Sequence, residues 1–190
     1  MPLMPLWCRK ARPVTVMCPV TPDVVDSLKA TLRGLPHDLE KKDSPLLLNG
    51  RTHFGRWVVI QRLVDEDGMA SSDELSVPYL LFTSIIDGPV RTYFQALVEA
   101  SPEQMHRIWS HCIGYEPGDD ALVAYLYRNQ IRTNLFFAPY ARASLAKVRS
   151  VLDLRKAFID FAVRTDGMTG DKLLGAFQAW YGDQARNVSC

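Results

Sequence analysis

The 190-residue sequence lacks the features that mark several classes of protein. It has no apolar run close to the roughly 20 residues that a helix needs to cross a bilayer. Its first residues, 1–7, are too few for a signal peptide and lack a small-residue cleavage site. The formal net charge is only +1, with acidic and basic residues mixed along the chain, so no charged tract indicates binding to nucleic acid or to an anionic membrane. We therefore expect a cytoplasmic protein that binds neither.

Motifs for nucleotide binding, metal binding and serine nucleophiles are missing as well. The sequence contains no Gly-x-Gly-x-x-Gly, no phosphate-binding loop and no nucleophile elbow. The four cysteines, Cys8, Cys18, Cys112 and Cys190, are scattered and show no Cys-x-x-Cys spacing. We expect reduced thiols and no metal site, with Cys18 and Cys112 packed as small hydrophobic residues.

The densest stretch that the chain does contain is residues 52–60, Thr-His-Phe-Gly-Arg-Trp-Val-Val-Ile. Its β-branched and aromatic residues predict a central β-strand. Strict alternation would place His53 and Trp57 on one face and Arg56 on the other, unless a bulge at Gly55 changes the alternation. A strand this apolar that still carries a histidine and an arginine is the first candidate for a site.

The remaining patterns predict strands and helices in a definite order. Strands are expected at 14–18, 78–86 and 131–138. Helices are expected after Thr21-Pro22 up to Leu35, after Asp87-Gly88-Pro89, after Ser101-Pro102 up to Gly114, at 121–129, from Ser144 to about Val163, and at 171–181. Hydroxyl caps are predicted at Thr21, Ser101 and Ser144, and Asp166-Gly167 is predicted to break the long helix. Segments 37–50 and 65–74 are expected to be loops. The fold class that follows is α+β: a ferredoxin-like βαββαβ four-stranded antiparallel sheet with helices on one face and extra C-terminal helices. Residues 1–13 would form an extended arm before a single domain, residues 14–190.

Several motifs resemble those of a known superfamily. The strand that leads through Pro19-Val20-Thr21-Pro22 into a helix resembles the first unit of dimeric α+β barrels, which include monooxygenases, small cyclases and heme-binding peroxidases. His53-Phe54-Gly55-Arg56-Trp57 and the later Asp87-Gly88 resemble the His-Phe-Ala-Arg-Trp and Ser-Asn-Phe-Asp-Gly motifs of a bacterial set within it. The chain departs from that set at Asn129-Gln130, where the set has His-Gln. The resemblance implies a homodimer with a ferredoxin-like fold, and little about chemistry.

The uncovered face of such a sheet would be the wall of a small-molecule site. The catalytic candidates that we expect there are His53, Arg56, Asp87, Arg132 and Asn134. The candidates for substrate binding are Trp57, Tyr79, Thr83, Phe136 and Tyr140. Histidine suits general acid–base work, and a cation beside an amide and a phenol suits an oxygen-stabilising clamp. The expected protein is an enzyme of the cyclase, lyase or monooxygenase type that uses no cofactor and acts on an apolar or aromatic metabolite.

Structural alternatives remain open for each of these residues. His53 could be a hydrogen-bonded structural histidine, Asp87 a turn or helix-cap residue, and the group around Arg132 a polar dimer interface. A second functional hypothesis is a heme-binding oxidoreductase with His111 as the axial ligand, because heme-binding members of the superfamily take that ligand from a helix after the sheet. A third is a non-enzymatic binding or assembly module, suggested by the aromatic residues around Trp180.

Overall fold

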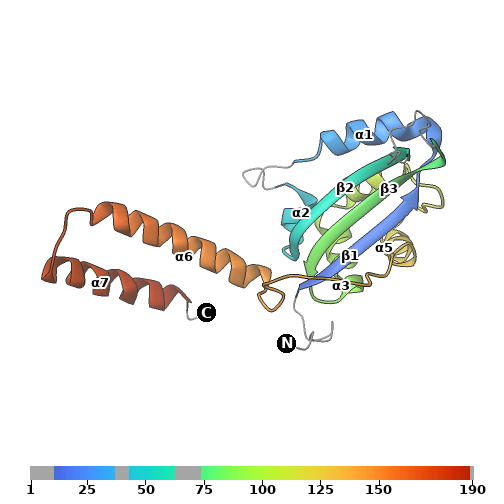
Figure 1. The fold of residues 1–190 in the computed structure, drawn as a ribbon. Helices are drawn as coiled ribbons and strands as arrows, with labels where there is room; N and C mark the ends of the chain where they lie inside the picture. Colours follow the sequence, from blue (N-terminus) through green and yellow to red (C-terminus); the bar gives the residue numbers. More distant parts are fainter. Residues whose placement is uncertain (1–10, 37–42, 63–73, 189–190) are drawn as a thin grey trace. The chain divides into compact units, whose positions relative to one another are not determined.

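The computed structural model describes residues 11–36, 43–62 and 74–188, and the chain divides into two compact units, Met1–Arg142 and Ala143–Cys190. The elements of the first unit are β1 (Ala11–Pro19), a 3-10 turn (Pro22–Val24), α1 (Val25–Arg33), α2 (Pro45–Leu48), β2 (Thr52–Arg62), β3 (Glu74–Asp87), α3 (Val90–Ala100), α4 (Pro102–Trp109) and α5 (Asp119–Arg128). The second unit contains α6 (Leu145–Arg164) and α7 (Asp171–Val188) (Figure 1). No helix in these ranges combines the length and apolar content needed to cross a membrane.

The three strands form an antiparallel sheet in the order β1-β3-β2. The prediction of an α+β fold with an antiparallel sheet is therefore confirmed. The prediction that residues 52–60 form the central strand is wrong, because β3 lies in the middle and pairs with both β1 and β2. β3 also begins at Glu74, four residues before the expected start, and the predicted loop before it lies mostly outside the described residues.

The predicted fourth strand, residues 131–138, does not form. The chain approaches the free edge of β1 at both ends of this segment, with Ile131 N donating to Thr15 O at 2.8 Å and Ala11 N donating to Ala141 O at 3.1 Å. Between these two bonds the segment is irregular. Pro13 explains the interruption, since odd-numbered residues of β1 face this edge and proline has no N–H to donate. Residues 131–141 therefore run beside an edge of β1 that only residues 11–15 form. The segment is longer than this edge, so it does not stay extended along it.

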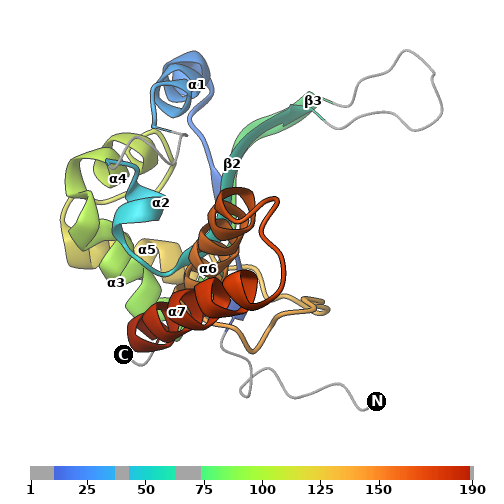
Figure 2. The ribbon, with the colours of Figure 1, turned by 90° about the vertical axis from the view of Figure 1, so that its left-hand side faces the viewer.

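Helices α1 to α5 lie against one face of the sheet (Figure 2). The core between them is formed by alternate residues of the strands and the inward sides of the helices, including Val14, Val16 and Cys18 of β1, Leu80, Phe82 and Ile86 of β3, and Leu28, Tyr93, Phe94, Leu97, Ile108, Trp109, Leu122 and Leu126. Cys112 is buried beside this core, so the expected packing of Cys18 and Cys112 as small hydrophobic residues is confirmed. The helices of this unit thus leave the other face of the sheet uncovered.

At the helix starts, the predicted prolines are confirmed, whereas two of the predicted hydroxyl caps are wrong. Pro22 and Pro102 stand in the first turns of their helices, as expected. The hydroxyl caps predicted at Thr21 and Ser101 are wrong, because neither side chain accepts a bond from its helix and the Ser101 hydroxyl donates to Ala100 O instead. Helix α2 lies in a segment predicted to be a loop, of which residues 37–42 are outside the described ranges.

The second unit is a hairpin of two helices. Ser144 accepts a bond from the backbone N–H of Lys147 at 3.2 Å, which confirms the predicted cap of α6. α6 ends at Arg164, so the predicted break at Asp166-Gly167 is also confirmed, and Gly167 takes the left-handed backbone conformation (φ 78°) that favours glycine. Phe161 and Trp180, whose ring centroids lie 5.2 Å apart, pack the two helices together.

Candidate functional site

The uncovered face of the sheet is organised in rungs of side chains that cross all three strands. The strand registers align Pro13, Ile85 and Phe54; Thr15, Thr83 and Arg56; Met17, Leu81 and Val58; and Pro19, Tyr79 and Ile60. The Thr15–Thr83–Arg56 rung is polar, and the rungs on both sides of it are apolar. Apolar side chains with a few fixed polar groups among them have the composition of a small-molecule site.

Arg56 and Thr83 occupy the polar rung together. The Arg56 Nε–H donates to Thr83 Oγ1 at 3.1 Å, and the side chain of Arg56 is exposed. This bond fixes the inner part of the guanidinium over the middle of the sheet while its outer N–H groups stay accessible. A guanidinium in this position can bind a carboxylate or a developing oxyanion in a two-pronged arrangement.

His53 reaches the same face because β2 carries a bulge. The register shifts between Thr52 and Phe54, so His53 is the extra residue. Its Nε2 lies 2.8 Å from Oδ1 of Asp87, which continues the row of Thr83 and Ile85 along β3. Opposite faces were expected for His53 and Arg56 only in a regular strand, and a bulge does bring them to one face, although it stands at His53 rather than at the suspected Gly55.

The His53–Asp87 pair is partly shielded from water, with side-chain exposures of 11% and 20%. An ionised carboxylate only accepts hydrogen bonds. In this pair His53 Nε2 therefore carries a hydrogen, and the Nε2–H donates a hydrogen bond to Asp87 Oδ1. In the neutral ring Nδ1 then keeps its lone pair, and no other described residue hydrogen-bonds the ring. A base oriented by a carboxylate in this way can take a proton from a ligand on the face.

A network of buried hydroxyl groups supports the bulge from the core side of the sheet. The Tyr93 hydroxyl on α3 lies 3.1 Å from Thr52 Oγ1 and 3.3 Å from Ser84 Oγ, and Ser84 donates to the Phe54 carbonyl at 2.7 Å. Burial raises the pKa of Tyr93 above its usual value, so the phenol stays neutral as a donor. These positioning residues were not predicted. Their polar type at core positions was the only signal in the sequence.

Other predicted site residues do not join this group. Arg132, Asn134 and Tyr140 are exposed on the irregular segment after α5, and within the described residues no hydrogen bond links them into the expected clamp. Phe136 belongs to the same segment. Trp57 lies on the core face, where it stacks on Phe82 with ring centroids 4.9 Å apart. Tyr79 does lie on the uncovered face, two rungs beyond Thr83.

Comparison with known proteins adds no family. No family model matches the chain, and no curated protein or solved structure matches it. The likeness of the His53 and Asp87 motifs to the dimeric α+β barrel superfamily therefore stays a prediction. The chemistry must be argued from the sheet face itself.

The surroundings of His111 do not fit an axial heme ligand. Its Nδ1–H donates to the Ile108 carbonyl at 3.2 Å, so Nε2 accepts from the Ser27 hydroxyl, 3.1 Å away on α1. The lone pair that iron would need is already engaged. His106 is engaged at both nitrogens too, by Tyr115 at 2.7 Å and Asp119 at 2.8 Å. No cluster of three His, Cys, Asp or Glu side chains suits a metal ion within the described ranges.

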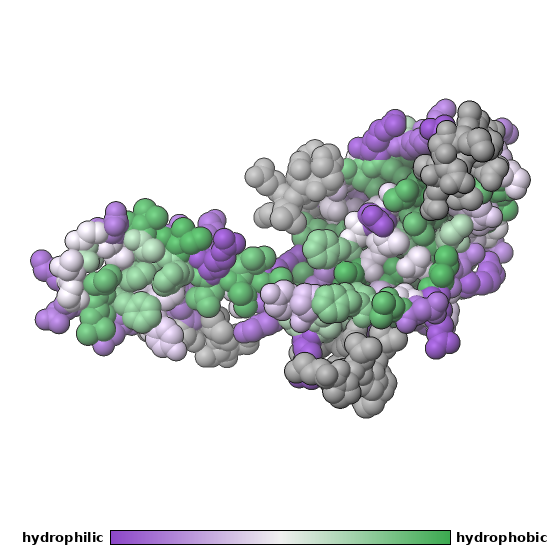
Figure 3. Space-filling model, viewed as in Figure 1, coloured by the Kyte–Doolittle hydropathy of each residue, from purple (hydrophilic) through white to green (hydrophobic). Residues whose placement is uncertain are grey.

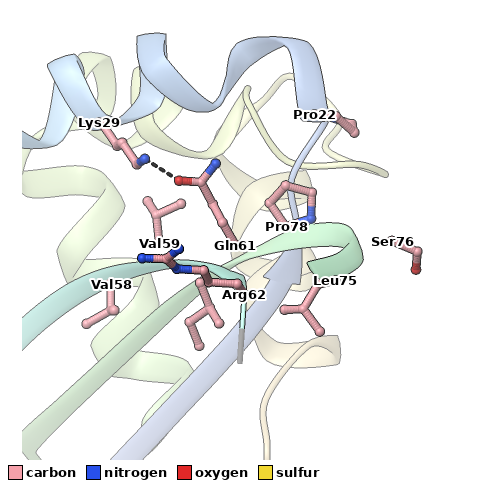
Figure 4. Close-up of a pocket in the computed structure, with 10 residues that line it drawn as sticks. Pro22, Lys29, Val58, Val59, Gln61, Arg62, Leu75, Ser76 and Pro78 are labelled. Carbon is pink, nitrogen blue, oxygen red and sulfur yellow. Dashed lines mark hydrogen bonds between the residues drawn. The ribbon is translucent and has the colours of Figure 1, made fainter. Parts of the chain in front are cut away.

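A hollow of about 720 Å³ lies at the opposite end of β2. It is lined by Pro22, Lys29, Val58, Val59, Ile60, Gln61, Arg62, Leu75, Ser76 and Pro78. Figure 4 shows Lys29 of α1 directed at Gln61, to which its ammonium group donates a hydrogen bond. From His53 to Val58, the nearest lining residue on β2, the strand covers roughly 17 Å, so the hollow borders the rung next to Arg56 but does not include the His53–Asp87 pair. We place the candidate site at the pair because, among the described residues, an acid–base group and a cation flank one apolar rung there.

Proposed function

We propose that the uncovered sheet face binds an apolar or aromatic metabolite and that His53 transfers a proton to or from it. The observation that carries the proposal is the order of groups along β3. The apolar rung of Ile85 and Phe54 lies between the His53–Asp87 pair and the Arg56–Thr83 pair. Thr83 and Asp87 are four residues apart, which spaces their backbones roughly 13 Å along the strand. A ligand of two or three fused or linked rings can span this gap.

The roles of the three groups follow from their chemistry. The flat apolar part of the ligand lies on Ile85 and Phe54, and an anionic or carbonyl oxygen of the ligand binds Arg56. His53 Nδ1 removes a proton from the ligand, and Asp87 stabilises the imidazolium that forms. The negative charge left on the ligand collects on the oxygen beside Arg56. Proton abstraction next to an oxygen is the first step of many cyclase and lyase reactions, so this class suits the face.

Binding can be tested with 1-anilinonaphthalene-8-sulfonate, which combines aromatic rings with one anion. We expect Arg56→Met to raise its dissociation constant by about tenfold, the effect of losing one hydrogen bond to a charged group. Arg107→Met is the matched control, since Arg107 is an exposed arginine on α4. Equal dissociation constants for wild type, Arg56→Met and Arg107→Met would remove the proposed anion contact.

Catalysis can be tested on any compound that native mass spectrometry finds bound to the purified protein. With this compound as substrate, His53→Gln is expected to lower kcat by about 10²-fold or more, as loss of a general base does. Asp87→Asn should lower kcat as well, because its amide no longer stabilises the imidazolium. Unchanged kcat in both variants would leave a binding protein without the proposed chemistry.

A non-enzymatic assembly module is the second candidate function. The observation that favours it is the number of large apolar side chains that the α6–α7 hairpin leaves exposed, among them Leu152, Val163 and Tyr181. A protein that only assembles would need this surface and not the His53–Asp87 pair. The kcat measurements on His53→Gln and Asp87→Asn separate the two candidates.

A further inference from the structure

The α6–α7 hairpin buries little of its own apolar surface. Of the large hydrophobic residues in the described part of this unit, only Leu145 and Phe161 are buried. The seam between the helices is aromatic, with Phe158 and Phe161 of α6 against Phe177 and Trp180 of α7. A unit of this size with one thin seam gains too little from burial to stand alone.

A second apolar row runs along α6, away from the seam. Leu152, Ile159 and Val163 are spaced seven and four residues apart, so they share one side of the helix, on which the exposed Arg155 stands between Leu152 and Ile159. Their exposed fractions are 54%, 48% and 71%. Val148 extends the row towards the start of the helix. At 100° per residue the row is turned by roughly 140° from the Phe158–Phe161 seam, so it does not pack against α7.

Helix α7 carries a matching row on the same side of the hairpin. Leu174 and Tyr181 are seven residues apart, with exposed fractions of 55% and 60%, and they are turned by roughly 80° from the seam in the same rotational sense. Because the two helices run antiparallel, equal rotational senses place both rows on one side. Figure 3 shows hydrophobic side chains gathered over both helices of the hairpin. We call this surface, centred on Leu152, Val163, Leu174 and Tyr181, the hairpin face.

The area of the hairpin face is that of a stable interface. Its members with 39–71% exposure are Leu152, Ile159, Val163, Leu174 and Tyr181 of the two rows, together with Val151 and the exposed parts of the seam residues Phe158 and Phe177. At about 150–250 Å² for a large side chain, they present on the order of 800 Å². A stable protein–protein interface buries about 800 Å² on each partner. A second copy related by a two-fold axis is therefore large enough to cover all of these exposed side chains.

The charges on the opposite side of the hairpin indicate a protein partner. Arg149, Lys156, Arg164 and Lys172 stand there among Asp153, Asp160 and Asp183, so both signs are present in nearly equal number. A helix that lies on an anionic membrane carries mainly lysine and arginine on its polar side. Two antiparallel helices with one apolar face are half of a four-helix bundle, and an identical half completes the bundle with a closed, isologous contact.

We propose that two copies of the chain associate through their hairpin faces and that α6 and α7 of both copies form a four-helix bundle. The bundle buries Leu152, Val163 and Leu174 from both sides. It leaves Arg149 and Asp153 in water. The contact does not depend on the proposed proton transfer, since its residues all belong to α6 and α7.

Sedimentation equilibrium of the full chain tests this contact. Wild type is expected to be a dimer, and Leu152→Asp should raise the dimer dissociation constant by at least about 30-fold, the effect of losing one central contact residue. Asp153→Asn is the matched control on the neighbouring, charged side and should leave the dimer intact. Because Leu152 is exposed in the hairpin, helical circular dichroism of Leu152→Asp at high concentration should stay close to that of wild type.

Three outcomes would overturn the proposal. The first is a monomeric wild type across the micromolar range, which includes the case in which the hairpin face is covered within one chain. The second is a dimer that persists in Leu152→Asp and dissociates in Phe54→Asp, which places the contact on the sheet. The third is binding of wild type to vesicles of anionic phospholipid that Leu152→Asp abolishes without any change in sedimentation.

Discussion

The position of His53 depends on one extra residue in β2. Without the register shift between Thr52 and Phe54, alternation would turn the imidazole into the core, away from Arg56. With it, the ring bonds Asp87 and shares a face with Arg56. The sequence singled out His53, Arg56 and Asp87 as candidates, yet it did not pair His53 with Asp87. A bulge is decided by contacts between strands, which single-sequence patterns do not contain.

The contribution of the buried hydroxyl network to the bulge can be tested by removing the hydroxyl of Tyr93. Tyr93→Phe removes one buried hydroxyl between Thr52 and Ser84 and should lower the free energy of unfolding by about 1 kcal/mol near neutral pH. Burial raises the pKa of Tyr93 above its ordinary value of 10.0. The phenol therefore stabilises the fold below pH 10, and this contribution is lost as the pH rises towards the higher pKa of the folded state.

The check is urea unfolding of wild type and Tyr93→Phe between pH 8 and pH 11. The gap in stability between the two proteins should shrink above pH 10. Tyr127→Phe serves as the control, because Tyr127 is 51% exposed and its loss should change neither the stability nor its pH dependence. A gap that stays constant across the range would mean that the buried phenol does not titrate as described.

At the scale of elements, periodicity predicted the helices better than it predicted the sheet edge. The long helix from Ser144 and the break at Gly167 follow from local signals, a hydroxyl cap and a glycine in the left-handed conformation. Residues 131–138 have the alternation of a strand, but Pro13 on the neighbouring strand removes the donor that pairing needs. Local propensity is therefore overridden by a partner more than 100 positions away.

The predicted hydroxyl caps at Ser144 and Thr21 differ in the structure, and their variants should differ too. Ser144→Ala removes the bond from Lys147 N and should weaken the first turn of α6 by about 1 kcal/mol. The amides of Lys147 and Val148 should then exchange hydrogen about fivefold faster. Thr21→Ala should leave exchange in α1 unchanged, since Thr21 makes no cap bond. Equal acceleration at both sites would contradict this distinction.

For the whole molecule, composition and periodicity predicted the α+β class and the apolar character of the strands, but they did not predict where the exposed apolar surface collects. The chain was expected to form a single domain from residue 14 to 190, and it divides into two compact units after Arg142. Within the described residues each unit leaves an apolar surface uncovered, the sheet face around Leu81 and Ile85 in the first and the hairpin face in the second. We assign the metabolite to the sheet face and the protein partner to the hairpin face.

The most direct test of the sheet face is a methyl NMR titration with 1-anilinonaphthalene-8-sulfonate. Met17, Val58, Leu81 and Ile85 carry methyl groups on the rungs beside Arg56, and their resonances are predicted to shift together at one dissociation constant. Methyl groups of the core face, such as those of Leu80, should move little. Shifts confined to α6 and α7, with the four sheet-face methyl groups unmoved, would contradict the account.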